Sequence, residues 1–517
     1  MSSNAVVTPH HLSAEAGRHV LSAGGNAVDA AVAVVAAQGV VAPETCGVGG
    51  DLFALVQAPG WPRPRTLNAS GRAGSNADPE ALRGAGLGGI MADHPAAVTI
   101  PGCVDGLVTL ISELGTMEMG EVLQPAIELA RGGFEASAEQ HLAFTRRAKT
   151  YADNPAVSSF YPDGEAVPRG ATVEREDLAR TLEAIVDDGR DGFYQGTAGE
   201  DISDAVGNLI TMEDLAASQA EWVTPISARV AGLDAWTVPP NSQGFLGPAT
   251  LGVFEILDPP DDPEDPMWWH LLIEAYRSLA WERDDLVSDP DTVALPVDLL
   301  LDPGRLERAA ASIETGRTGI WPTPLGRASS TAYMCVADAD GMAVSIIQSN
   351  YNGTGSAFGA ARSGFLLQDR GSGFTLTPGH PNELRPGKRP LHTLSPTLWT
   401  DVTEPRWLLG TRGGAVQPQL IAQMAARAIR GGTDLDHAQN APRWTISDFG
   451  PGTGSELQFE PTAPDAVVAD LRSRGHVISK LDERPRGWGP ISIIEVDGSN
   501  RRAAADPRVD TTAALIF

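Results

Sequence analysis

Thr331 is the residue whose type and position most clearly predict chemistry. The chain around it predicts a β-hairpin, with a strand beginning at Thr331, a DADG turn at 338–341 and a return strand ending at Ser349. Hairpin register then places Ser349 and Asn350 beside Thr331, at the open end of the ladder. A cut before Thr331 would free its α-amine, which can act as the general base for its own hydroxyl. Threonine also opens strands for its β-propensity alone, so the pattern by itself leaves both interpretations open.

Other residues with reactive side chains give weaker signals. Cys335 lies on the same strand face as Thr331, but a buried cysteine is usually a small apolar filler. The run GVGG at 47–50 lacks the GxGxxG spacing of a dinucleotide site. The ten histidines show no HExxH spacing, and the three cysteines form no CxxC pair. We therefore expect neither a cofactor nor a metal.

The elements that must position Thr331 follow from periodicity and turn residues. Gly24 and Gly25 end a first helix, and Asn26 can cap the next one. The Pro/Asp-rich run 258–266 predicts a solvated loop, and 315–330 predicts an exposed connector before the hairpin. Helices are expected over 12–23, 27–38 and 417–430, and helical periodicity returns over 104–131 and 177–188. A glycine-rich turn that feeds a buried strand is expected over 47–56, and further strands over 331–337, 342–349, 364–367, 406–410 and 491–496.

Composition limits the class of protein and of partner. The 517 residues include 38 basic and 66 acidic side chains, a net charge of −28, which disfavours nucleic acid as a partner. The longest apolar stretch, 27–41, is interrupted by Asp29 and Gln38 and is too short to span a membrane. No secretory signal is visible, and three cysteines cannot build a disulfide framework. These features predict a cytoplasmic protein that binds a small molecule.

Eight segments of distinctive sequence follow one another along the chain. They are GGNAVDAAVA (24–33), GVGGDLFALV (47–56), PGCVDGL (101–107), VPPNSQG (238–244), TAYMCVADADGMAV (331–344), GKRPLHTLSPT (387–397), GTRGGAVQPQ (410–419) and ADPR (505–508). Together, in this order, they resemble the γ-glutamyltransferase family of N-terminal nucleophile hydrolases. The resemblance implies an α+β fold in four αββα layers and a proenzyme that cuts itself between Ser330 and Thr331. It also implies that segments 1–330 and 331–517 form a heterodimer of large and small fragments, which could pair further.

The resemblance also implies roles for individual residues. Thr331 matches the nucleophile, and Ser349 matches a second hydroxyl residue that hydrogen-bonds to it. Gly413 and Gly414 match the glycine pair whose backbone N–H groups form the oxyanion hole. Acyl transfer needs such donors, and glycine allows the close approach and unusual dihedral angles that they require. The same glycines could instead lead into a helix that begins near Gln417.

The residues that hold the γ-glutamyl group in this family do not line up here. The carboxylate-binding arginine falls near Ser70, with Arg72 two positions away, and the acidic partner of the α-amine falls on Gly373. His392 and Thr393 replace the two serines after KRP. Without the acidic partner, a substrate ammonium would be buried unpaired, at a cost of several kcal/mol. The departures predict an amide substrate other than glutathione, as in the acylase and amidohydrolase relatives.

Arginine side chains near the expected pocket still suit an acyl group that carries a carboxylate. Arg370 could instead be a solvated loop charge, Arg72 a structural arginine, and His392 a structural histidine. Arg412 is a further polar residue near the expected pocket. The predicted substrate-binding residues are Arg72, Asn350, Arg370, His392 and Thr393.

Three alternatives remain beside an autoprocessing threonine amidohydrolase or acyltransferase. One is a true γ-glutamyltransferase or glutathione hydrolase with a clamp rearranged around Arg72. Another is an ester or carbon–carbon hydrolase that uses the same apparatus. The last is a catalytically inactive relative that acts by binding, which the retention of Thr331, Ser349 and both glycines disfavours.

Overall fold

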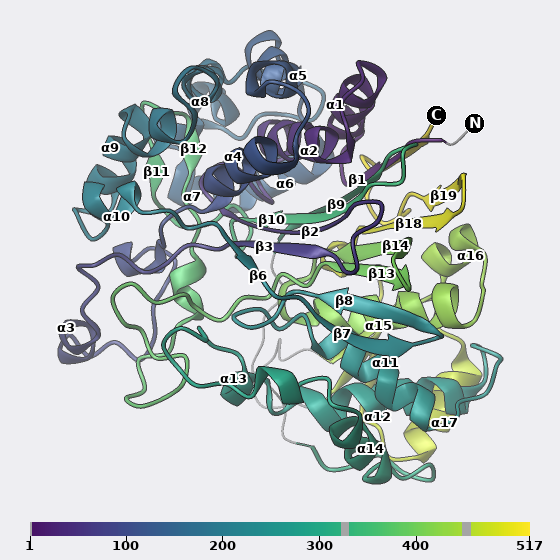
Figure 1. Ribbon diagram of the computed structural model, residues 1–517. Helices are drawn as coiled ribbons and strands as arrows, with labels where there is room; N and C mark the ends of the chain where they lie inside the picture. Colours follow the sequence, from purple (N-terminus) through teal and green to yellow (C-terminus); the bar gives the residue numbers. More distant parts are fainter. Residues whose placement is uncertain (1–2, 322–329, 447–455) are drawn as a thin grey trace.

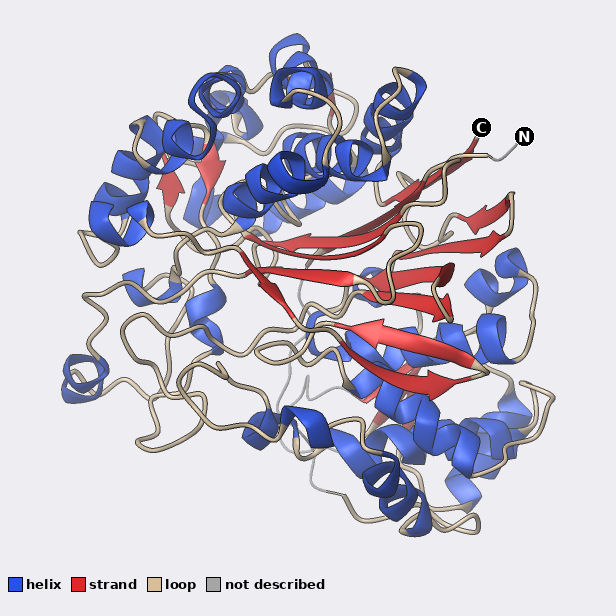
Figure 2. Cartoon of the chain, in the orientation of Figure 1, coloured by secondary structure: helices blue, strands red, loops and turns tan. Residues whose placement is uncertain are grey.

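Two β-sheets lie face to face at the centre of the protein, and helices cover both outer faces (Figure 1; helices blue and strands red in Figure 2). The computed structural model describes residues 3–321, 330–446 and 456–517. The first sheet has seven strands in the order β20-β1-β9-β10-β2-β3-β6, and the second has six in the order β19-β18-β14-β13-β8-β7. This is the predicted four-layer αββα sandwich.

Both sheets combine strands that are far apart in the sequence. The first contains β20 (Ala513–Ile516), β1 (Ala5–Thr8), β9 (Ala332–Ala337), β10 (Ala343–Ser349), β2 (Asp51–Gln57), β3 (Arg65–Ala69) and β6 (Glu221–Val223). The second contains β19 (Asn500–Ala504), β18 (Ile491–Asp497), β14 (Glu404–Thr411), β13 (Thr397–Asp401), β8 (Leu233–Thr237) and β7 (Ile226–Val230). Segments 1–330 and 331–517 each contribute strands to both sheets, so the two segments share one core.

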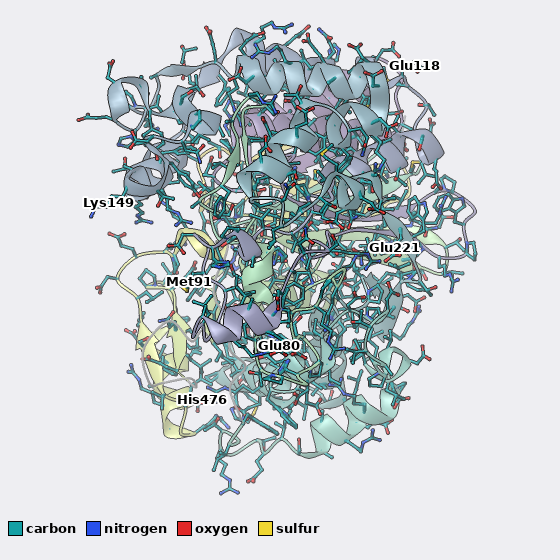
Figure 3. All side chains as sticks on the ribbon, turned by 90° about the vertical axis from the view of Figure 1, so that its left-hand side faces the viewer. Glu80, Met91, Glu118, Lys149, Glu221 and His476 are labelled. Carbon is teal, nitrogen blue, oxygen red and sulfur yellow. The ribbon has the colours of Figure 1, made fainter. Side chains whose placement is uncertain are left out.

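One helical layer comes from the first half of the chain and the other mainly from the middle and end. Glu118, at the start of α5, and His476, just after α17, mark these two layers in Figure 3. The first layer includes α1 (His11–Ser22), α2 (Ala27–Val41), α4 (Cys103–Leu114), α5 (Met119–Gly132) and α8 (Glu176–Tyr194). The second includes α11 (Leu246–Ile256), α12 (Pro266–Ala280), α14 (Pro303–Ala311), α15 (Gln417–Ala425) and α17 (Asp465–Ser473).

Shorter elements fill the edges of the sandwich. The helices are α3 (Pro79–Gly84), α6 (Ala138–Arg146), α7 (Ala148–Tyr151), α9 (Thr197–Ala205), α10 (Met212–Ala216), α13 (Arg283–Leu286) and α16 (Leu435–Asn440). The strands are β4 (Phe134–Glu135), β5 (Thr172–Val173), β11 (Gly359–Ala360), β12 (Phe365–Leu366), β15 (Trp444–Ile446), β16 (Leu457–Phe459) and β17 (Ile478–Lys480).

Alternation along β9 shows how the sequence builds two cores at once. Met334 and Val336 join the apolar cluster under the first helical layer, whereas Tyr333 and Cys335 join the cluster between the two sheets. Side chains of a strand point to opposite faces in turn, so a strand buried on both sides is a continuous apolar run. The run AYMCVA follows this rule, and all six of its residues are buried.

The predicted hairpin is confirmed, with its register one residue from the ideal two-residue turn. Ala337 pairs with Ala343 and Ala332 with Gln348, so the ladder continues toward Thr331 and Ser349. The amide of Asp338 donates to the carbonyl of Met342, which makes 339–341 a three-residue loop.

Most other expected elements are present with altered ends. Asn26 caps α2 through a capping box with Asp29, as its sequence predicts, and α2 runs on to Val41. The helical periodicity expected over 104–131 is present as two helices, α4 and α5, because the chain turns at Gly115. The connector expected at 315–330 lies partly outside the described residues. Among the described helices, none is long and apolar enough to cross a membrane.

Gly410 on β14 marks how tightly the two sheets pack. A Cβ built there would lie 2.4 Å from the ring of Tyr333 on β9. We expect Gly410→Ala to lower the free energy of unfolding by about 1–3 kcal/mol, because the ring and strand must shift. Urea unfolding measures the change. Gly88→Ala is the control, because Gly88 is exposed and a Cβ built on it would have no atom within 4 Å. Equal stability of the two variants would contradict this account.

Candidate active site

The hairpin brings two hydroxyl groups to one peptide carbonyl. Thr331 Oγ1 lies 2.7 Å from the carbonyl oxygen of Ser330 and 3.1 Å from Ser349 Oγ. Ser349 Oγ lies 2.9 Å from the same carbonyl oxygen and accepts a hydrogen bond from the amide of Tyr351 at 2.9 Å. Thr331 and Ser349 are both buried. Both hydroxyl groups thus contact the carbonyl of the Ser330–Thr331 peptide bond, an arrangement suited to attack by a neighbouring hydroxyl.

The glycine pair forms a strained turn between β14 and α15. Gly413 has φ 135° and Gly414 has φ 56°, both in the region that favours glycine. A Cβ on Gly413 would lie 3.1 Å from Val416 Cγ2 and 3.3 Å from the carbonyl oxygen of Gly487. Gln243 Nε2 donates to the carbonyl oxygen of Gly414 at 3.1 Å, so the turn is held from a neighbouring segment. The turn does lead into α15, yet that role alone does not require two consecutive left-handed residues.

A pocket of about 380 Å³ adjoins Ser330 and reaches the residue before the glycine pair. Its wall combines the hairpin side, the α6–α7 region and the 486–487 turn. The lining residues are Glu44, Thr45, Glu139, Leu142, Ala143, Arg146, Arg147, Ser330, Asn352, Gly353, Thr354, Arg412, Arg486 and Gly487. Four of them are arginines, so the pocket can attract an anion.

The two acidic side chains of this pocket differ in charge state. Arg412 donates to both carboxylate oxygens of Glu139 at 2.9 Å, and this pair outweighs the effect of burial and lowers the pKa of Glu139. Burial, and then the nearby charge of Glu139, raises the pKa of Glu44 to about 8. At neutral pH the lining therefore carries four arginines against one ionised carboxylate.

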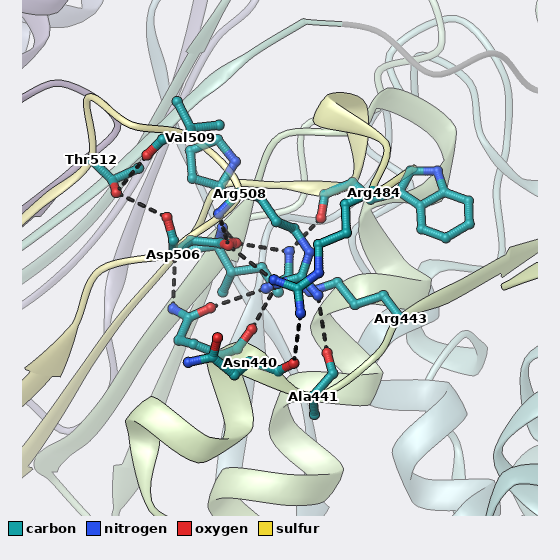
Figure 4. A network of polar contacts seen from close by, with 12 residues as sticks. Asn440, Ala441, Arg443, Arg484, Asp506, Arg508, Val509 and Thr512 are labelled. Atoms are coloured by element: carbon teal, nitrogen blue, oxygen red, sulfur yellow. Dashed lines mark hydrogen bonds and ion pairs between the residues drawn. The ribbon is translucent and has the colours of Figure 1, made fainter. Parts of the chain in front are cut away.

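A buried ion-pair network holds the 486–488 turn that closes this pocket (Figure 4). Within the ADPR segment, Arg508 Nη1 lies 3.2 Å from Asp506 Oδ1. Arg443 Nη1 lies 2.8 Å from the other carboxylate oxygen, Asp506 Oδ2. Arg443 also donates to the carbonyl of Trp488, and Arg508 pairs with Glu460 at 2.6 Å. The ADPR segment thus has a structural function: it anchors the turn whose Arg486 carbonyl accepts from Arg412.

Arg370 is buried rather than solvated, so the interpretation of it as a surface loop charge is wrong. Its Nη1 donates to Thr393 Oγ1 at 3.2 Å, and its guanidinium carbon lies 4.0 Å from the centre of the Tyr351 ring. Since Tyr351 N bonds to Ser349, the structure brings Arg370 and Thr393 to the same region as the hairpin end.

His392 lies in that region with both ring nitrogens occupied by protein groups. Its Nε2 lies 3.0 Å from Asp51 Oδ2, and its Nδ1 accepts from the amide of Leu394 at 3.3 Å. Burial, followed by the charge of Arg370, lowers the pKa of His392 to about 3, so the ring is neutral. These contacts make His392 a positioning residue of the core, not the cationic group that its ordinary pKa would allow.

The two remaining residues predicted to bind substrate, Arg72 and Asn350, lie in different surroundings. Arg72 ion-pairs with Asp291 at 3.2 Å and Asp289 at 3.5 Å, so its charge is already matched by protein carboxylates. Asn350 is buried, and its backbone nitrogen lies 3.5 Å from the carbonyl oxygen of Thr45. Its side-chain Oδ1 has no hydrogen-bond partner in the described chain. The structure brings Asn350 to the hairpin end but directs Arg72 into an ion-pair cluster.

Cys335 is not suited to nucleophilic chemistry. It is fully buried between the sheets, and burial raises the pKa of its thiol. Within the described ranges, no group of three or more histidine, cysteine or acidic side chains could hold a metal ion.

Sequence reasoning missed four residues that shape this site: Glu44, Asp51, Gln243 and Tyr351. Asp51 and Gln243 lie inside runs that resemble the family, so their segments were recognised but their contacts were not. Glu44 and Tyr351 gave no signal, because their importance depends on partners distant in sequence or on burial.

Glu44 should make stability depend on pH. Its pKa is raised from 4.5 to about 8, so the unfolded chain loses this proton at lower pH than the folded chain. Its contribution therefore destabilises the fold as pH rises from about 4.5 to 8, by a few kcal/mol at most. We expect the stability of Glu44→Gln relative to wild type to increase across this range, as measured by urea unfolding. Exposed Glu128→Gln is the control, and parallel curves for Glu44→Gln and wild type would contradict the prediction.

Comparisons with known proteins show the family of this chain and agree with its fold. Residues 13–516 match the gamma-glutamyltranspeptidase family. The glutathione hydrolase-like YwrD proenzyme of Bacillus subtilis (strain 168) is 35% identical, with 99% of this chain and 98% of the relative covered. The oxamate amidohydrolase proenzyme of Klebsiella pneumoniae is 33% identical over 98% of this chain and 97% of that protein.

A solved structure gives the same result in three dimensions. The cephalosporin acylase from Bacillus halodurans superposes with a TM-score of 0.90 and 31% identity, covering 99% of this chain and 96% of its own. The relatives are named as hydrolases and acylases, and several are named as proenzymes. The chain therefore belongs to the gamma-glutamyltranspeptidase family of N-terminal nucleophile hydrolases and is a hydrolase of its acylase-like and amidohydrolase-like branch.

Proposed function

We propose that the protein is an autoprocessing threonine amidohydrolase. The uncut chain cleaves its own Ser330–Thr331 bond and becomes a heterodimer of fragments 1–330 and 331–517. Thr331, as the new N-terminus of the second fragment, then attacks amide substrates. The observation that supports this most directly is the contact of Thr331 Oγ1, at 2.7 Å, and Ser349 Oγ, at 2.9 Å, with the carbonyl oxygen of the peptide to be cut.

In the proposed reaction the α-amine of Thr331 carries the proton, and the C–N bond of the substrate amide is the bond that breaks. Thr331 Oγ bonds to the substrate carbonyl carbon while the α-amine of Thr331 takes the hydroxyl proton. The backbone N–H groups at Gly413 and Gly414 stabilise the oxyanion that develops. The C–N bond breaks as the α-amine passes the proton to the leaving nitrogen. Water then attacks the ester, releasing the acid and restoring the threonine hydroxyl.

The substrate is an amide other than glutathione. Gly373 stands where the γ-glutamyl enzymes have the acidic partner of the substrate α-amine, and a glycine cannot supply that charge. A clamp rebuilt around Arg72 finds no support, because Asp289 and Asp291 already pair with that side chain. The relatives named oxamate amidohydrolase and acylase act on other amides by name, in line with this substrate class.

Thr331→Ala should abolish both cleavage and activity, because the hydroxyl performs the attack in each. The measurement is the intact mass of freshly purified wild-type and variant protein. Wild type should give two fragments that meet between Ser330 and Thr331, and the variant should give one chain. Cleavage at that bond in Thr331→Ala would remove the role we assign to this residue.

Two further variants make the mass measurement specific. Cys335→Ala should be cut like wild type, because its thiol is buried between the sheets. Ser349→Ala should be cut more slowly, because the carbonyl of Ser330 loses its second hydroxyl contact. The two wild-type fragments should stay together in gel filtration and separate only in denaturant, since both sheets contain strands from each.

Gly413→Ala should leave the fold intact and reduce turnover by about 100-fold, because a displaced oxyanion donor typically costs about 100–1,000-fold. The φ of 135° and the 3.1 Å approach of Val416 both oppose a side chain there. Gly432→Ala is the matched control, since Gly432 also has positive φ, 62°, but a Cβ built on it would have no atom within 4 Å. Steady-state kcat distinguishes the two; equal activity of both variants would make Gly413 only a structural turn.

A further inference from the structure

Arg370 has a buried guanidinium edge that receives no hydrogen-bond acceptor from the described residues. The side chain has no exposed surface, and its Nε and Nη2 atoms have no hydrogen-bond partner in the described chain. Only Nη1 is bound, to Thr393 Oγ1 at 3.2 Å. Nε and Nη2 form one edge of the guanidinium, the edge that binds a carboxylate through two parallel hydrogen bonds.

The neighbouring carboxylates do not fill this edge. Asp51 Oδ2 lies 3.9 Å from Arg370 Nε, too far for a hydrogen bond. The oxygens of Asp51 already accept from the Gly71 amide at 2.8 Å, from Gln368 at 2.9 Å and from His392 at 3.0 Å. Asp369 is directed to the backbone and side chain of Asn352, with distances of 2.9 and 3.0 Å.

Arg370 is tied to both halves of the proposed reaction centre. On one side its guanidinium lies 4.0 Å from the Tyr351 ring, and the Tyr351 amide donates to Ser349 Oγ beside Thr331. On the other side it holds Thr393, whose carbonyl accepts from Gln243 Nε2 at 3.3 Å. The same Gln243 nitrogen donates to the carbonyl of Gly414. The free edge therefore lies in the contact network that joins the nucleophile to the glycine pair.

A buried cation with unused donors is unfavourable for folding. Leaving a buried donor unsatisfied costs about 1–3 kcal/mol, and more when the group is charged. Burial lowers the pKa of Arg370, which reflects the same unfavourable desolvation. Such a group is expected where it binds a ligand of opposite charge, because the ligand then supplies the missing acceptor oxygens.

We propose that the free edge of Arg370 binds a carboxylate in the acyl part of the substrate, so that the enzyme hydrolyses half-amides of dicarboxylic acids. The reaction is then ⁻OOC–R–CO–NH₂ + H₂O → ⁻OOC–R–COO⁻ + NH₄⁺, with Thr331 attacking the amide carbon. This rests on the function proposed above and specifies its substrate. It also gives the arginine-rich pocket a role, since a positive lining draws anionic substrates toward the cut bond.

Matched substrate pairs test the charge preference. The probes are oxamate with oxamide, malonamate with malonamide, and succinamate with succinamide, and the readout is ammonia release, with Thr331→Ala as background. Wild type should prefer the carboxylated member of at least one pair. Arg370→Gln should reduce that preference by about 10–100-fold, mainly through KM, because hydrogen bonds to charged groups contribute about 1.5–3 kcal/mol. The preference of Arg370→Lys should fall between those of wild type and Arg370→Gln, since lysine keeps the positive charge but cannot form two parallel hydrogen bonds to a carboxylate.

A stability measurement separates binding from structure. Arg370→Met should unfold at the same or a higher temperature than wild type, because it removes a buried charge with unsatisfied donors. Arg175→Met is the matched control, since that buried arginine donates to the carbonyls of Gly39, Val40 and Gly364 and its loss should lower the unfolding temperature. A large loss of stability in Arg370→Met would show that Arg370 is structural and overturn the inference.

Each remaining outcome decides one of the two proposals. Equal turnover of charged and neutral members, or an equal loss on both in Arg370→Gln, would overturn the carboxylate inference and leave the amidohydrolase intact. A wild-type chain that stays uncut and releases no ammonia would overturn the amidohydrolase itself. Calorimetry of oxalate, malonate and succinate binding to wild type and Arg370→Gln gives a readout without turnover. Binding lost in the variant supports the inference, and equal or absent binding in both contradicts it.

Discussion

The antiparallel pairing of β9 with β10 is the constraint on which the site depends. This ladder fixes Thr331 opposite the end of β10, so that the hydroxyls of Thr331 and Ser349 meet at the carbonyl of Ser330. A shift of one residue would direct alternate side chains to the wrong face of the sheet. The apolar face toward α2 and the opposite face toward the second sheet both oppose such a shift, because β9 is buried on each side.

The second sheet positions the glycine pair, which the hairpin does not contain. β14 ends at Thr411, and the turn that follows presents Gly413 and Gly414 before α15 begins. Gly410 allows β14 to approach Tyr333 closely, so the glycine turn is carried toward the hairpin by the packing of the two sheets. Gln243, from the segment after β8, then fixes the turn through its carbonyl groups. The hydroxyl groups and the glycines thus come from different sheets, which pack against each other in one shared core.

Charge divides the buried polar groups into two kinds. Arg412, Arg443 and Arg508 pair with carboxylates, and those pairs hold the walls of the pocket in place. Glu44 has no ion pair among the described residues, and Arg370 lies 3.9 Å from Asp51 without a hydrogen bond to it. Burial moves the pKa values of both groups toward the neutral forms. A paired buried charge holds the local structure in place, whereas a buried charged group that lacks hydrogen-bond partners is stabilised when it binds a ligand or, for a carboxylate, a proton. This contrast is the basis for proposing Arg370 as the group that binds a substrate carboxylate.

The local elements and the resemblance to the family can be read from the amino-acid sequence. The β9–β10 hairpin and the Asn26 cap depend on neighbours a few residues apart, so turn chemistry and periodicity predicted them. The role of the glycine pair is expected from the resemblance to the family. The roles of the charged residues, by contrast, follow from the folded arrangement of the chain. Arg72 meets Asp291, Arg370 meets Thr393, and His392 meets Asp51, all across large sequence separations. Burial and partner charge set what such side chains can do, and both arise only when distant segments pack together.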